Sequence, residues 1–427
     1  MAVFSTADNE TLTATNRGTP MGELFRRYWI PALQSEDLPR PDCPPVRVQL
    51  LGEKLVAFRD SAGRIGLMDE FCAHRRVSLF YGRNEENGLR CTYHGWKYDV
   101  TGQCVDLPSE PVATGICQKV KLKSYPCIEQ GGVIWTYMGA PDKQPAPPAL
   151  EWTTVAPEQR YVTRRVQASN YLQAMEGGLD SSHVPFLHRE ALLSDPIVAG
   201  AKGNEYYRDL MPIFVVKPFS GGLLIGARRQ ADEDSYFWRI TPWVMPMFSF
   251  VPPRGHHPTH AHAFVPIDDH HCWMWNISFH PRRALSQKEL AAMRAGSSIH
   301  SPAVPPPGPL PTAENDYLIN REAQAAGISY SGIQGVGIQD AALQESMGPI
   351  VDRAAEILVA TDSGIIQVRR ALLEAAKANA EGKEPPGLTT ESQQVCSCSI
   401  ELPMDADFVE GAKHGIFRER LADPVSV

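Results

Sequence analysis

Short runs rich in β-branched and other apolar residues characterise the chain between about residue 45 and residue 140. The clearest runs cover residues 46–51, 54–59 and 132–137, and turn sequences such as residues 60–63 separate them. Runs of this kind, bounded by glycine, serine and aspartate turns, are typical of β-strands. The pattern therefore predicts an antiparallel β-domain in this part of the chain.

The rest of the chain mixes strand patterns with helical ones. Thr19 followed by Pro20 is typical of a helix start, with threonine as the capping residue and proline in the first turn. Apolar residues at helical spacing between residues 341 and 378 predict helices, which Gly348-Pro349 and residues 362–364 divide into segments. Further strands are predicted at residues 223–227, 236–241, 261–265 and 272–279.

Proline-rich stretches indicate how the chain is divided. Residues 139–148 have the composition of a linker, and residues 301–311, with six prolines, are expected to cover the surface or the mouth of an active site. The prediction is an α+β protein in three parts. These are a helical segment over 1–30, a β-domain over 31–150, and a larger domain of mixed strands and helices over 151–427.

Composition and charge restrict the possible partners. The chain has 427 residues, of which 43% are hydrophobic and 21% charged, and its net charge is −8. The negative charge argues against nucleic acid and against anionic membrane surfaces as partners. No secretory signal and no apolar run of about 18 residues is evident. Nine cysteines, an odd number, favour reduced thiols and a cytoplasmic location over a disulfide framework.

Two Cys-His pairs lie close together in the predicted β-domain. Cys72 and His74 form a CxH motif, and Cys91 and His94 form a CxxH motif. Structural zinc sites usually group their cysteines as CxxC, whereas each motif here offers one thiolate and one imidazole. This order fits a Rieske [2Fe–2S] cluster, in which two cysteines bind one iron and two histidines bind the other. A zinc knuckle is the alternative.

A second group of metal-binding residue types follows the linker. Asp180, His183 and His188 form a D-x2-H-x4-H motif. On a helix Asp180 and His183 would share a face, and Pro185 would end or kink that helix and bring His188 round. Two imidazoles and one carboxylate are the ligands of the facial triad that holds non-haem Fe(II). The alternative is that these histidines are surface or packing residues.

Several longer segments together resemble the large (oxygenase) subunits of Rieske non-haem iron oxygenases. They are C-A-H-R-R, C-T-Y-H-G-W-K-Y-D-V-T-G, G-G-V-I-W-T-Y-M-G, E-G-G-L-D-S-S-H-V-P-F-L-H and Q-D-A-A-L-Q-E-S-M-G-P-I-V-D-R. The last block and the early G-T-P-M-G-E-L-F-R-R-Y-W look closest to the phthalate dioxygenase-like branch, which includes aryl ether O-demethylases. The resemblance implies a Rieske domain followed by a START-like helix-grip domain, an antiparallel sheet wrapped on helices.

The resemblance also assigns roles to acidic residues. It implies that Asp340 is the third iron ligand, although Asp340 at a helix start could equally be a cap. It implies that Asp180 bridges His183 to His94 of a neighbouring protomer, so that the chains form a head-to-tail trimer, or a hexamer built from such trimers.

Two further residues near the motif match positions that flank the iron in this family. Asn170 and Glu176 are therefore candidates for catalytic residues, and structural hydrogen bonding is the alternative for both.

The activity that the resemblance implies needs O₂ and two electrons. No G-x-G-x-x-G motif is present, so NAD(P)H would be oxidised on a separate reductase with flavin and a ferredoxin centre. The oxygenase would oxidise an aromatic acid by ring cis-dihydroxylation or by O-demethylation of a methoxy or aryl ether substrate. Rival functions are an electron carrier without the mononuclear iron and a zinc-stabilised START-like ligand-binding protein.

Substrate contacts are less clearly encoded. Arg239 resembles a carboxylate-binding arginine of phthalate dioxygenases, and Arg208 and Lys202 are further candidates for binding the substrate. A surface arginine on a strand is the alternative for Arg239. Apolar side chains that are candidates for an aromatic pocket are Phe214, Trp243, Met245, Met247, Phe248 and Phe250.

Overall fold

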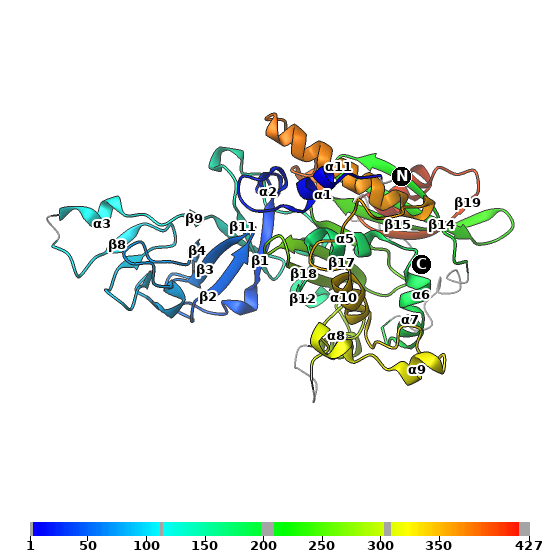
Figure 1. Ribbon diagram of the computed structural model, residues 1–427, viewed down its shortest axis with the longest axis horizontal. Coiled ribbons are helices and arrows are strands. Elements are labelled where there is room, and N and C mark those ends of the chain that lie inside the picture. The colour runs from blue at the N-terminus through cyan, green and yellow to red at the C-terminus, as the bar shows by residue number, and fades with distance from the viewer. Residues whose placement is uncertain (1–2, 112–113, 198–208, 303–308, 418–427) are drawn as a thin grey trace.

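The computed structural model describes residues 3–111, 114–197, 209–302 and 309–417. Figure 1 shows an elongated molecule with short strands toward one end and a large sheet with its helices toward the other. Lys202, Arg208 and most of the proline-rich loop, residues 303–308, lie outside the described residues. Among the described helices, none has the length and apolar character needed to cross a membrane.

The N-terminal part consists of small antiparallel sheets. One sheet has the order β2-β3-β4-β9, a second β5-β6-β7-β8 and a third β1-β11-β10. Their strands are β1 (Trp29–Gln34), β2 (Val46–Leu50), β3 (Glu53–Arg59), β4 (Ile65–Asp69), β5 (Arg83–Glu85), β6 (Gly88–Arg90), β7 (Lys97–Tyr98), β8 (Cys104–Asp106), β9 (Ser124–Tyr125), β10 (Cys127–Gln130) and β11 (Val133–Tyr137). A short helix, α3 (Ile116–Lys119), follows β8. The three strands predicted in this part of the chain, at residues 46–51, 54–59 and 132–137, are confirmed.

The larger part is built on one antiparallel sheet of eight strands. The strand order is β12-β18-β17-β16-β15-β14-β13, and β19 also pairs with β15. The strands are β12 (Arg160–Gln167), β13 (Ile213–Phe219), β14 (Gly222–Gln230), β15 (Ser235–Val244), β16 (Phe248–Val251), β17 (Thr259–Pro266), β18 (Cys272–Phe279) and β19 (Cys398–Pro403). The four strands predicted in this region are confirmed, and so is the α+β class.

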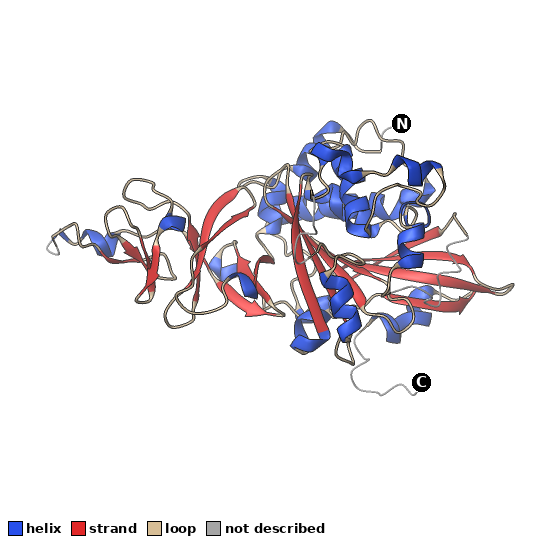
Figure 2. Cartoon of the chain, turned by 90° about the horizontal axis from the view of Figure 1, so that it is seen from below, coloured by secondary structure: helices blue, strands red, loops and turns tan. Residues whose placement is uncertain are grey.

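Helices lie on both faces of the large sheet (Figure 2). Those used below are α5 (Tyr171–Leu179), α6 (Val184–Leu187), α10 (Val336–Ser346) and α11 (Ser363–Ala380). The others are α1 (Thr6–Thr13), α2 (Pro20–Phe25), α4 (Glu151–Thr154), α7 (Arg189–Ser194), α8 (Gln287–Arg294), α9 (Arg321–Ala325), α12 (Thr390–Gln393) and α13 (Phe408–Ile416). The helix α5 contacts β16, β17 and β18, whereas α13 contacts β19.

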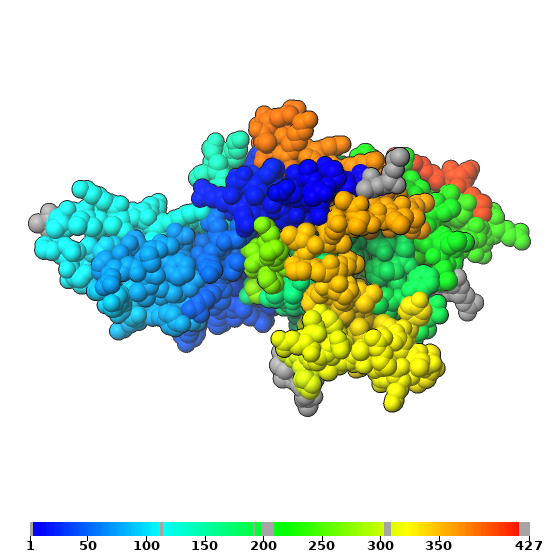
Figure 3. All heavy atoms as spheres, viewed as in Figure 1, coloured from blue at the N-terminus to red at the C-terminus, as the bar shows by residue number. Residues whose placement is uncertain are grey.

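The N-terminal helices pack on the C-terminal half of the chain. Thr19 caps α2 by accepting a hydrogen bond from Gly22, with Pro20 in the first turn, as predicted. The hydroxyl of Tyr28 donates to the carbonyl of Pro386 at 2.7 Å. Figure 3 shows the N-terminal residues, in dark blue, lying along the segment coloured orange. The first 30 residues are therefore joined to the larger part by direct contacts.

The predicted breaks at Gly348-Pro349 and at residues 362–364 are confirmed, whereas the helical segment predicted between them is wrong. Helix α10 ends at Ser346 and α11 begins at Ser363, and the chain between them forms no α-helix. Gly348 has a φ of +87°, and Pro349 has no amide hydrogen to donate, so a helix cannot continue through this pair. Ile357, one of the apolar residues at helical spacing, is 91% exposed.

A buried ionic cluster fixes α5 to the C-terminal part. Arg369 of α11 donates to both carboxylate oxygens of Glu176, at 2.8 and 3.0 Å, and Arg353 approaches both at 3.3 Å. Burial alone would raise the pKa of Glu176, but the charges of Arg353 and Arg369 outweigh it and lower this pKa. Arg353 also donates to Asn9 of α1. The cluster therefore ties α1, α5 and α11 together.

We expect the substitution Glu176→Gln to lower the free energy of unfolding by about 3–5 kcal/mol, because two buried guanidinium groups lose their shared counter-charge. Urea unfolding followed by circular dichroism measures this loss. The control is Glu384→Gln, which weakens a pair with Arg27 at a carboxylate that is 71% exposed. That change should cost less than about 1 kcal/mol. Equal losses in the two variants would contradict the prediction.

Candidate active site

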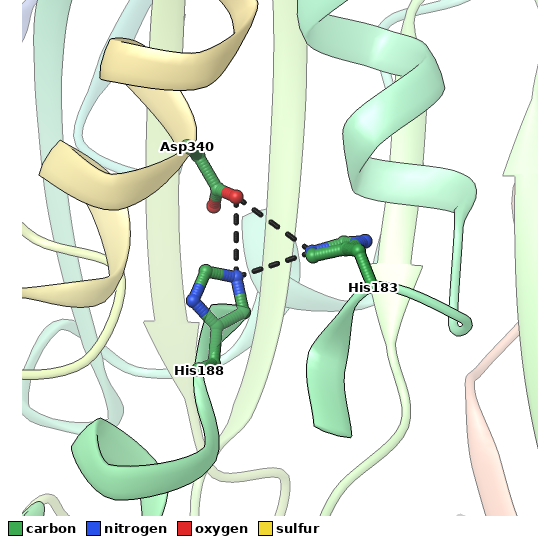
Figure 4. A group of neighbouring side chains, drawn as sticks. All are labelled: His183, His188 and Asp340. Atoms are coloured by element: carbon green, nitrogen blue, oxygen red, sulfur yellow. Dashed lines mark hydrogen bonds and ion pairs between the residues drawn. The ribbon is translucent and has the colours of Figure 1, made fainter. Parts of the chain in front are cut away.

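Two histidines and one aspartate converge at the end of α5, close to α10 (Figure 4). Nε2 of His188 lies 3.1 Å from Nε2 of His183 and 3.1 Å from Oδ1 of Asp340, and the third distance, between His183 and Asp340, is 3.7 Å. Metal bonds of about 2.1 Å at right angles place neighbouring ligand atoms about 3 Å apart. The three atoms therefore fit one face of an octahedral metal ion, as in a 2-His-1-carboxylate centre.

A bend between two helices presents the histidines. Asp180 is the C-cap of α5, and its Oδ1 accepts a hydrogen bond from the amide of Ser182 at 2.6 Å. His183 immediately precedes α6, and His188 follows it. The prediction that Asp180 and His183 share a helical face is therefore wrong. Pro185 stands at the start of α6, and the four-residue length of this helix brings His188 opposite His183.

Asp340 reaches the histidines from within α10. The helix begins at Val336, after Gly335 with a φ of +87°, so Asp340 lies beyond its first turn and does not cap it. Burial alone would raise the pKa of Asp340, but the charges of His188 and His183 outweigh it and bring this pKa to about 2. The side chain is thus a carboxylate at neutral pH, as a metal ligand must be.

Gln339 determines which nitrogen of His188 faces the other two residues. The Gln339 amide nitrogen donates to the carbonyl of Ile333 at 2.9 Å and to the hydroxyl of Ser331 at 3.0 Å. Its oxygen therefore faces His188 and accepts from Nδ1 at 2.7 Å. With the proton on Nδ1, the lone pair of Nε2 points toward Asp340. We did not predict this role from the sequence, where the only signal is a glutamine beside the candidate ligand.

Asp180 orients the ring of His183, as Gln339 orients the ring of His188. Its Oδ2 lies 3.2 Å from Nδ1 of His183, so Nε2 of that ring also faces the metal position. Burial alone would raise the pKa of Asp180, but the hydrogen bond and charge of His183 outweigh it and lower this pKa. One half of the bridge implied by the sequence resemblance, from Asp180 to His183, is therefore present within one chain.

Two glycines allow α5 to lie against both the sheet and α10. A Cβ atom on Gly177 would come within 2.0 Å of the Gln344 amide nitrogen, and one on Gly178 within 2.6 Å of the Phe264 ring. Gln173 of α5 donates to the carbonyl of Gln344 at 3.1 Å. The E-G-G-L-D sequence thus permits the close packing that brings His183, His188 and Asp340 together.

A cavity of about 110 Å³ adjoins the two histidines and Asp340. Arg239 and Arg254 line it and are 5% and 8% exposed. The prolines at 252, 253 and 258 form part of the wall. His260 and His262 also face it, and burial lowers their pKa values to about 3 and about 4, so that both are neutral at neutral pH.

The side chains expected to form an aromatic pocket lie elsewhere. Trp243, Met245, Met247, Phe248 and Phe250 are buried members of the hydrophobic core, and Phe214 packs against it. None of them lines this cavity. On β16 the alternation of the strand explains this, since Val251 lines the cavity whereas Phe248 and Phe250 face the opposite side. Trp243 shares a face of β15 with Arg239 and Thr241 but lies further along the strand, outside the cavity lining.

Asn170 and Glu176 lie away from the cavity lining. The amide nitrogen of Asn170 donates to the carbonyls of Thr13 and Asp269, and its oxygen caps α5. The Glu176 carboxylate belongs to the ionic cluster with Arg353 and Arg369. Both residues hold α5 in place, which is the structural alternative to a catalytic role.

The Cys-His motifs form a second candidate metal centre in the N-terminal sheets. Cys72 and Cys91 are buried, whereas His74 is exposed and His94 half-buried. The two imidazole rings lie 4.4 Å apart, and His74 stacks on Trp96. Within the described residues, the group compact enough for a single ion is the one containing Asp340, not this quartet. A two-iron cluster with separate cysteine and histidine ends fits this arrangement better than one zinc ion does.

Comparison with known families assigns both parts of the chain. Residues 28–126 match the Rieske [2Fe-2S] domain, and residues 136–410 match the LigXa C-terminal domain like family. The second match covers well over half of the chain. The two matched segments contain the Cys-His quartet and the group with Asp340, respectively.

Curated relatives extend over nearly the whole length. The 3-chlorobenzoate-3,4-dioxygenase oxygenase subunit of Comamonas testosteroni is 39% identical, with 91% of this chain and 92% of the relative covered. The phthalate 4,5-dioxygenase oxygenase subunit of Pseudomonas putida is 35% identical, covering 94% and 93%. The 5,5'-dehydrodivanillate O-demethylase oxygenase subunit of Sphingobium sp. (strain NBRC 103272 / SYK-6) is 29% identical, covering 90% and 84%.

Solved structures share the fold. A crystal structure of dicamba monooxygenase bound to dicamba superposes with a TM-score of 0.60 at 18% identity, covering 83% of this chain and 98% of that one. At this identity the likeness concerns the fold alone. It agrees with the predicted order of N-terminal sheets followed by a domain built on an antiparallel sheet.

We expect Gln339→Leu to weaken Fe(II) binding by about 10- to 100-fold, because His188 loses the acceptor that holds its proton on Nδ1. Competition with a ferrous chelator, with the iron–sulfur cluster intact, measures the affinity. Gln339→Glu keeps an acceptor and should bind Fe(II) within about threefold of the unsubstituted protein. Gln393→Leu removes an amide that likewise accepts and donates hydrogen bonds but lies away from the cavity lining, and serves as the control. An unchanged affinity in Gln339→Leu would show that Gln339 does not orient His188.

Proposed function

Since the chain belongs to the Rieske non-haem iron oxygenases, as an oxygenase subunit, we propose that it oxidises an aromatic carboxylic acid in the cavity beside His183, His188 and Asp340. Enzymes of this family use a Rieske cluster, a mononuclear iron and electrons supplied by a reductase. The iron would be held by these three residues, and the cluster by Cys72, His74, Cys91 and His94. When bound, the iron supplies the site at which O₂ is activated. The chain's own residues bind and orient the substrate.

The observation that carries the proposal is the pair of buried arginines in the cavity wall. Arg239 and Arg254 place two buried positive charges in the wall of the cavity, and Arg239 also donates to the carbonyl of Pro252 at 3.3 Å. The carboxylates in the described lining, Asp180 and Asp340, lie beside the histidines. A guanidinium group matches the geometry of a carboxylate and binds it with two parallel hydrogen bonds. The names of the two dioxygenase relatives, with chlorobenzoate and phthalate, support an aromatic acid.

We propose ring cis-dihydroxylation as the reaction, since the relatives at 39% and 35% identity are dioxygenase subunits. The second candidate is O-demethylation of a methoxy or aryl ether acid, which the name of the relative at 29% identity supports. Both reactions fit one cavity, because the outcome depends on whether a ring carbon or an ether carbon lies next to the iron. The electrons would come from NAD(P)H through a separate reductase carrying flavin and a ferredoxin centre.

We further propose that the protein works as a head-to-tail trimer, alone or paired as a hexamer. His74 is exposed and His94 half-buried, so their rings can be approached by another protomer. Asp180 already contacts His183 and lines the cavity, and the second contact would come from His94 of a neighbouring protomer. Within each protomer we propose domain boundaries near residues 30 and 150, the first at the start of β1 and the second after β11.

The proposed activity is tested with a panel of benzoate, 3-chlorobenzoate, phthalate and a methoxybenzoate, using a surrogate phthalate dioxygenase-type reductase. We expect one acid to yield a dihydrodiol or formaldehyde. Arg239→Gln should raise the KM for that acid about 10- to 100-fold, because a charged hydrogen bond is lost, while the KM for the matching neutral amide should change little.

Two control variants accompany this assay. Arg228→Gln alters an arginine of the same sheet that stacks on Tyr236, away from the cavity lining, and should leave the KM unchanged. His183→Ala should abolish product formation and keep the visible spectrum of the Rieske cluster. A colourless protein that binds only zinc would refute the proposed function.

We expect Asp180→Asn to retain both metal centres and to slow electron transfer between them by about 10- to 100-fold, because the charged partner of the two imidazoles is lost. Single-turnover oxidation of the pre-reduced cluster, in the presence of substrate and O₂, measures this rate. Metal content and the cluster spectrum are the controls. An unchanged single-turnover rate would refute a bridging role for Asp180.

A further inference from the structure

A continuous row of hydrogen-bonded side chains leads from the cavity to the outer strand of the large sheet. The hydroxyl of Ser298 lies 3.2 Å from Nε2 of His260, and Nδ1 of His260 lies 2.7 Å from the hydroxyl of Ser278. That hydroxyl lies 2.8 Å from Nε2 of His300, and Nδ1 of His300 lies 2.7 Å from the hydroxyl of Thr163. Hydroxyl and imidazole groups alternate along the whole row.

The row has one end in the cavity and the other at the edge of the sheet. Ser298 and His260 line the cavity. Ser278 and His300, in the middle, are 0% and 3% exposed. Thr163 belongs to β12, the last strand of the sheet, and is partly exposed. The row therefore passes through the protein interior between the cavity and solvent.

The row can carry its hydrogens in two complete arrangements. In one, each hydroxyl and each N–H donates toward the cavity, from Thr163 through His300, Ser278 and His260 to Ser298. In the other, every group donates toward Thr163. Both arrangements satisfy each atom of the row, because a neutral imidazole has one donor and one acceptor nitrogen and a hydroxyl serves as both. Burial lowers the pKa values of His260 and His300, so both rings are neutral at neutral pH.

The backbone at the cavity end is held in an uncommon conformation. Ser298 has a φ of +59°, which is rare for a residue other than glycine. Its amide donates to the carboxylate of Asp195 at 2.7 Å. Strained backbone of this kind persists where surrounding contacts fix it, often at functional sites. The contact with Asp195 thus keeps the Ser298 hydroxyl against His260 at the wall of the cavity.

We propose that Thr163, His300, Ser278, His260 and Ser298 form a proton relay that supplies protons from solvent to the oxygenase cavity. Dihydroxylation adds O₂, two electrons and two protons to the substrate, and O-demethylation uses the same inputs with release of water. Both protons must enter a cavity whose wall contains three prolines, which have no N–H to offer. The relay rests on the proposed function, because that oxygenase reaction consumes two protons. The row of side chains is the path by which these protons reach the cavity.

For each proton that enters the row from solvent, one proton leaves it into the cavity. A solvent proton binds the Thr163 hydroxyl, whose own proton passes to Nδ1 of His300. The Nε2 proton of His300 moves to Ser278, the Ser278 proton moves to His260, and the Nε2 proton of His260 moves to Ser298. The Ser298 proton enters the cavity. The row ends in its second arrangement with no net charge gained, and rotation of the hydroxyls with tautomer exchange of the imidazoles restores the first.

The test uses pre-reduced protein and an acid that the unsubstituted enzyme converts, with single turnover followed in H₂O and in D₂O. Thr163→Val keeps the shape of the side chain and removes the hydroxyl, whereas Thr163→Ser keeps the hydroxyl. We expect Thr163→Val and Ser278→Ala to lower the rate of product formation about tenfold or more and to raise the solvent isotope effect. Thr163→Ser should retain the rate of the unsubstituted enzyme.

Ser249→Ala is the matched control for Ser278→Ala. Ser249 is a buried serine of the same sheet whose hydroxyl has no hydrogen-bond partner among the described residues, so its loss should change neither rate nor isotope effect. Unchanged rates in Thr163→Val and Ser278→Ala would overturn the relay. So would slower rates with an unchanged isotope effect, which indicate a structural role. Failure of the unsubstituted enzyme to convert any acid would instead refute the proposed function.

Discussion

The close contact between α5 and α10 is the constraint on which the candidate active site depends. The two histidines follow α5, whereas Asp340 belongs to α10, and the three ligand atoms must lie within a few ångströms of one another. Gly177 permits the contact, because any side chain there would overlap Gln344. Gln173 then fastens it through the carbonyls of Gln344 and Gly348. A shift of one helix against the other would separate the carboxylate from the imidazoles, whatever the local geometry of either helix.

The buried ionic cluster fixes the same helix from another direction. Glu176 precedes Gly177 in sequence, yet its carboxylate is directed to Arg353 and Arg369 and not to the cavity. Buried charges are costly unless they are paired, so this cluster is satisfied in one relative position of α1, α5 and α11. The helix that presents the histidines is thereby held by glycine contacts on the side of α10 and by ion pairs on the side of α11.

Local sequence patterns predicted seven of the described strands and the two histidines of the candidate site, but not the conformations that bring the site together. His183 and His188 could be chosen from their spacing, and Asp180 does contact His183. The contact, however, arises at a bend and not on a shared helical face. Asp340 required the family resemblance, since nothing in the local pattern indicates which distant carboxylate will pack against α5. The breaks at Gly348-Pro349 and at residues 362–364 could be read from the sequence, but the apolar spacing around Ile357 predicted a helix between them that does not form.

Other residues of the site were missed for similar reasons. Gln339 orients His188 through a single hydrogen bond, and a buried glutamine has no distinctive sequence context. The shared orientation of His260 and His262 could have been predicted from the sequence. Alternate positions of a strand share one face, so T-H-A-H-A-F places both imidazoles on the same face of β17. Arg254 lies outside any predicted element, so its position in the cavity wall depends on the chain folding back between β16 and β17.

The distribution of charge in the cavity links substrate orientation to the choice of reaction. Because burial keeps His260 and His262 neutral, the positive charge of the wall is concentrated on Arg239 and Arg254. The negative charge is concentrated on Asp180 and Asp340, beside the histidines. The proposed aromatic acid would be oriented by this field with its carboxylate toward the arginines and the opposite part of its ring toward His183, His188 and Asp340. Under this proposal, the distance from the carboxylate to the nearest ring carbon or ether carbon decides which atom reacts, so small changes around the arginines would alter the reaction without any change in these three residues.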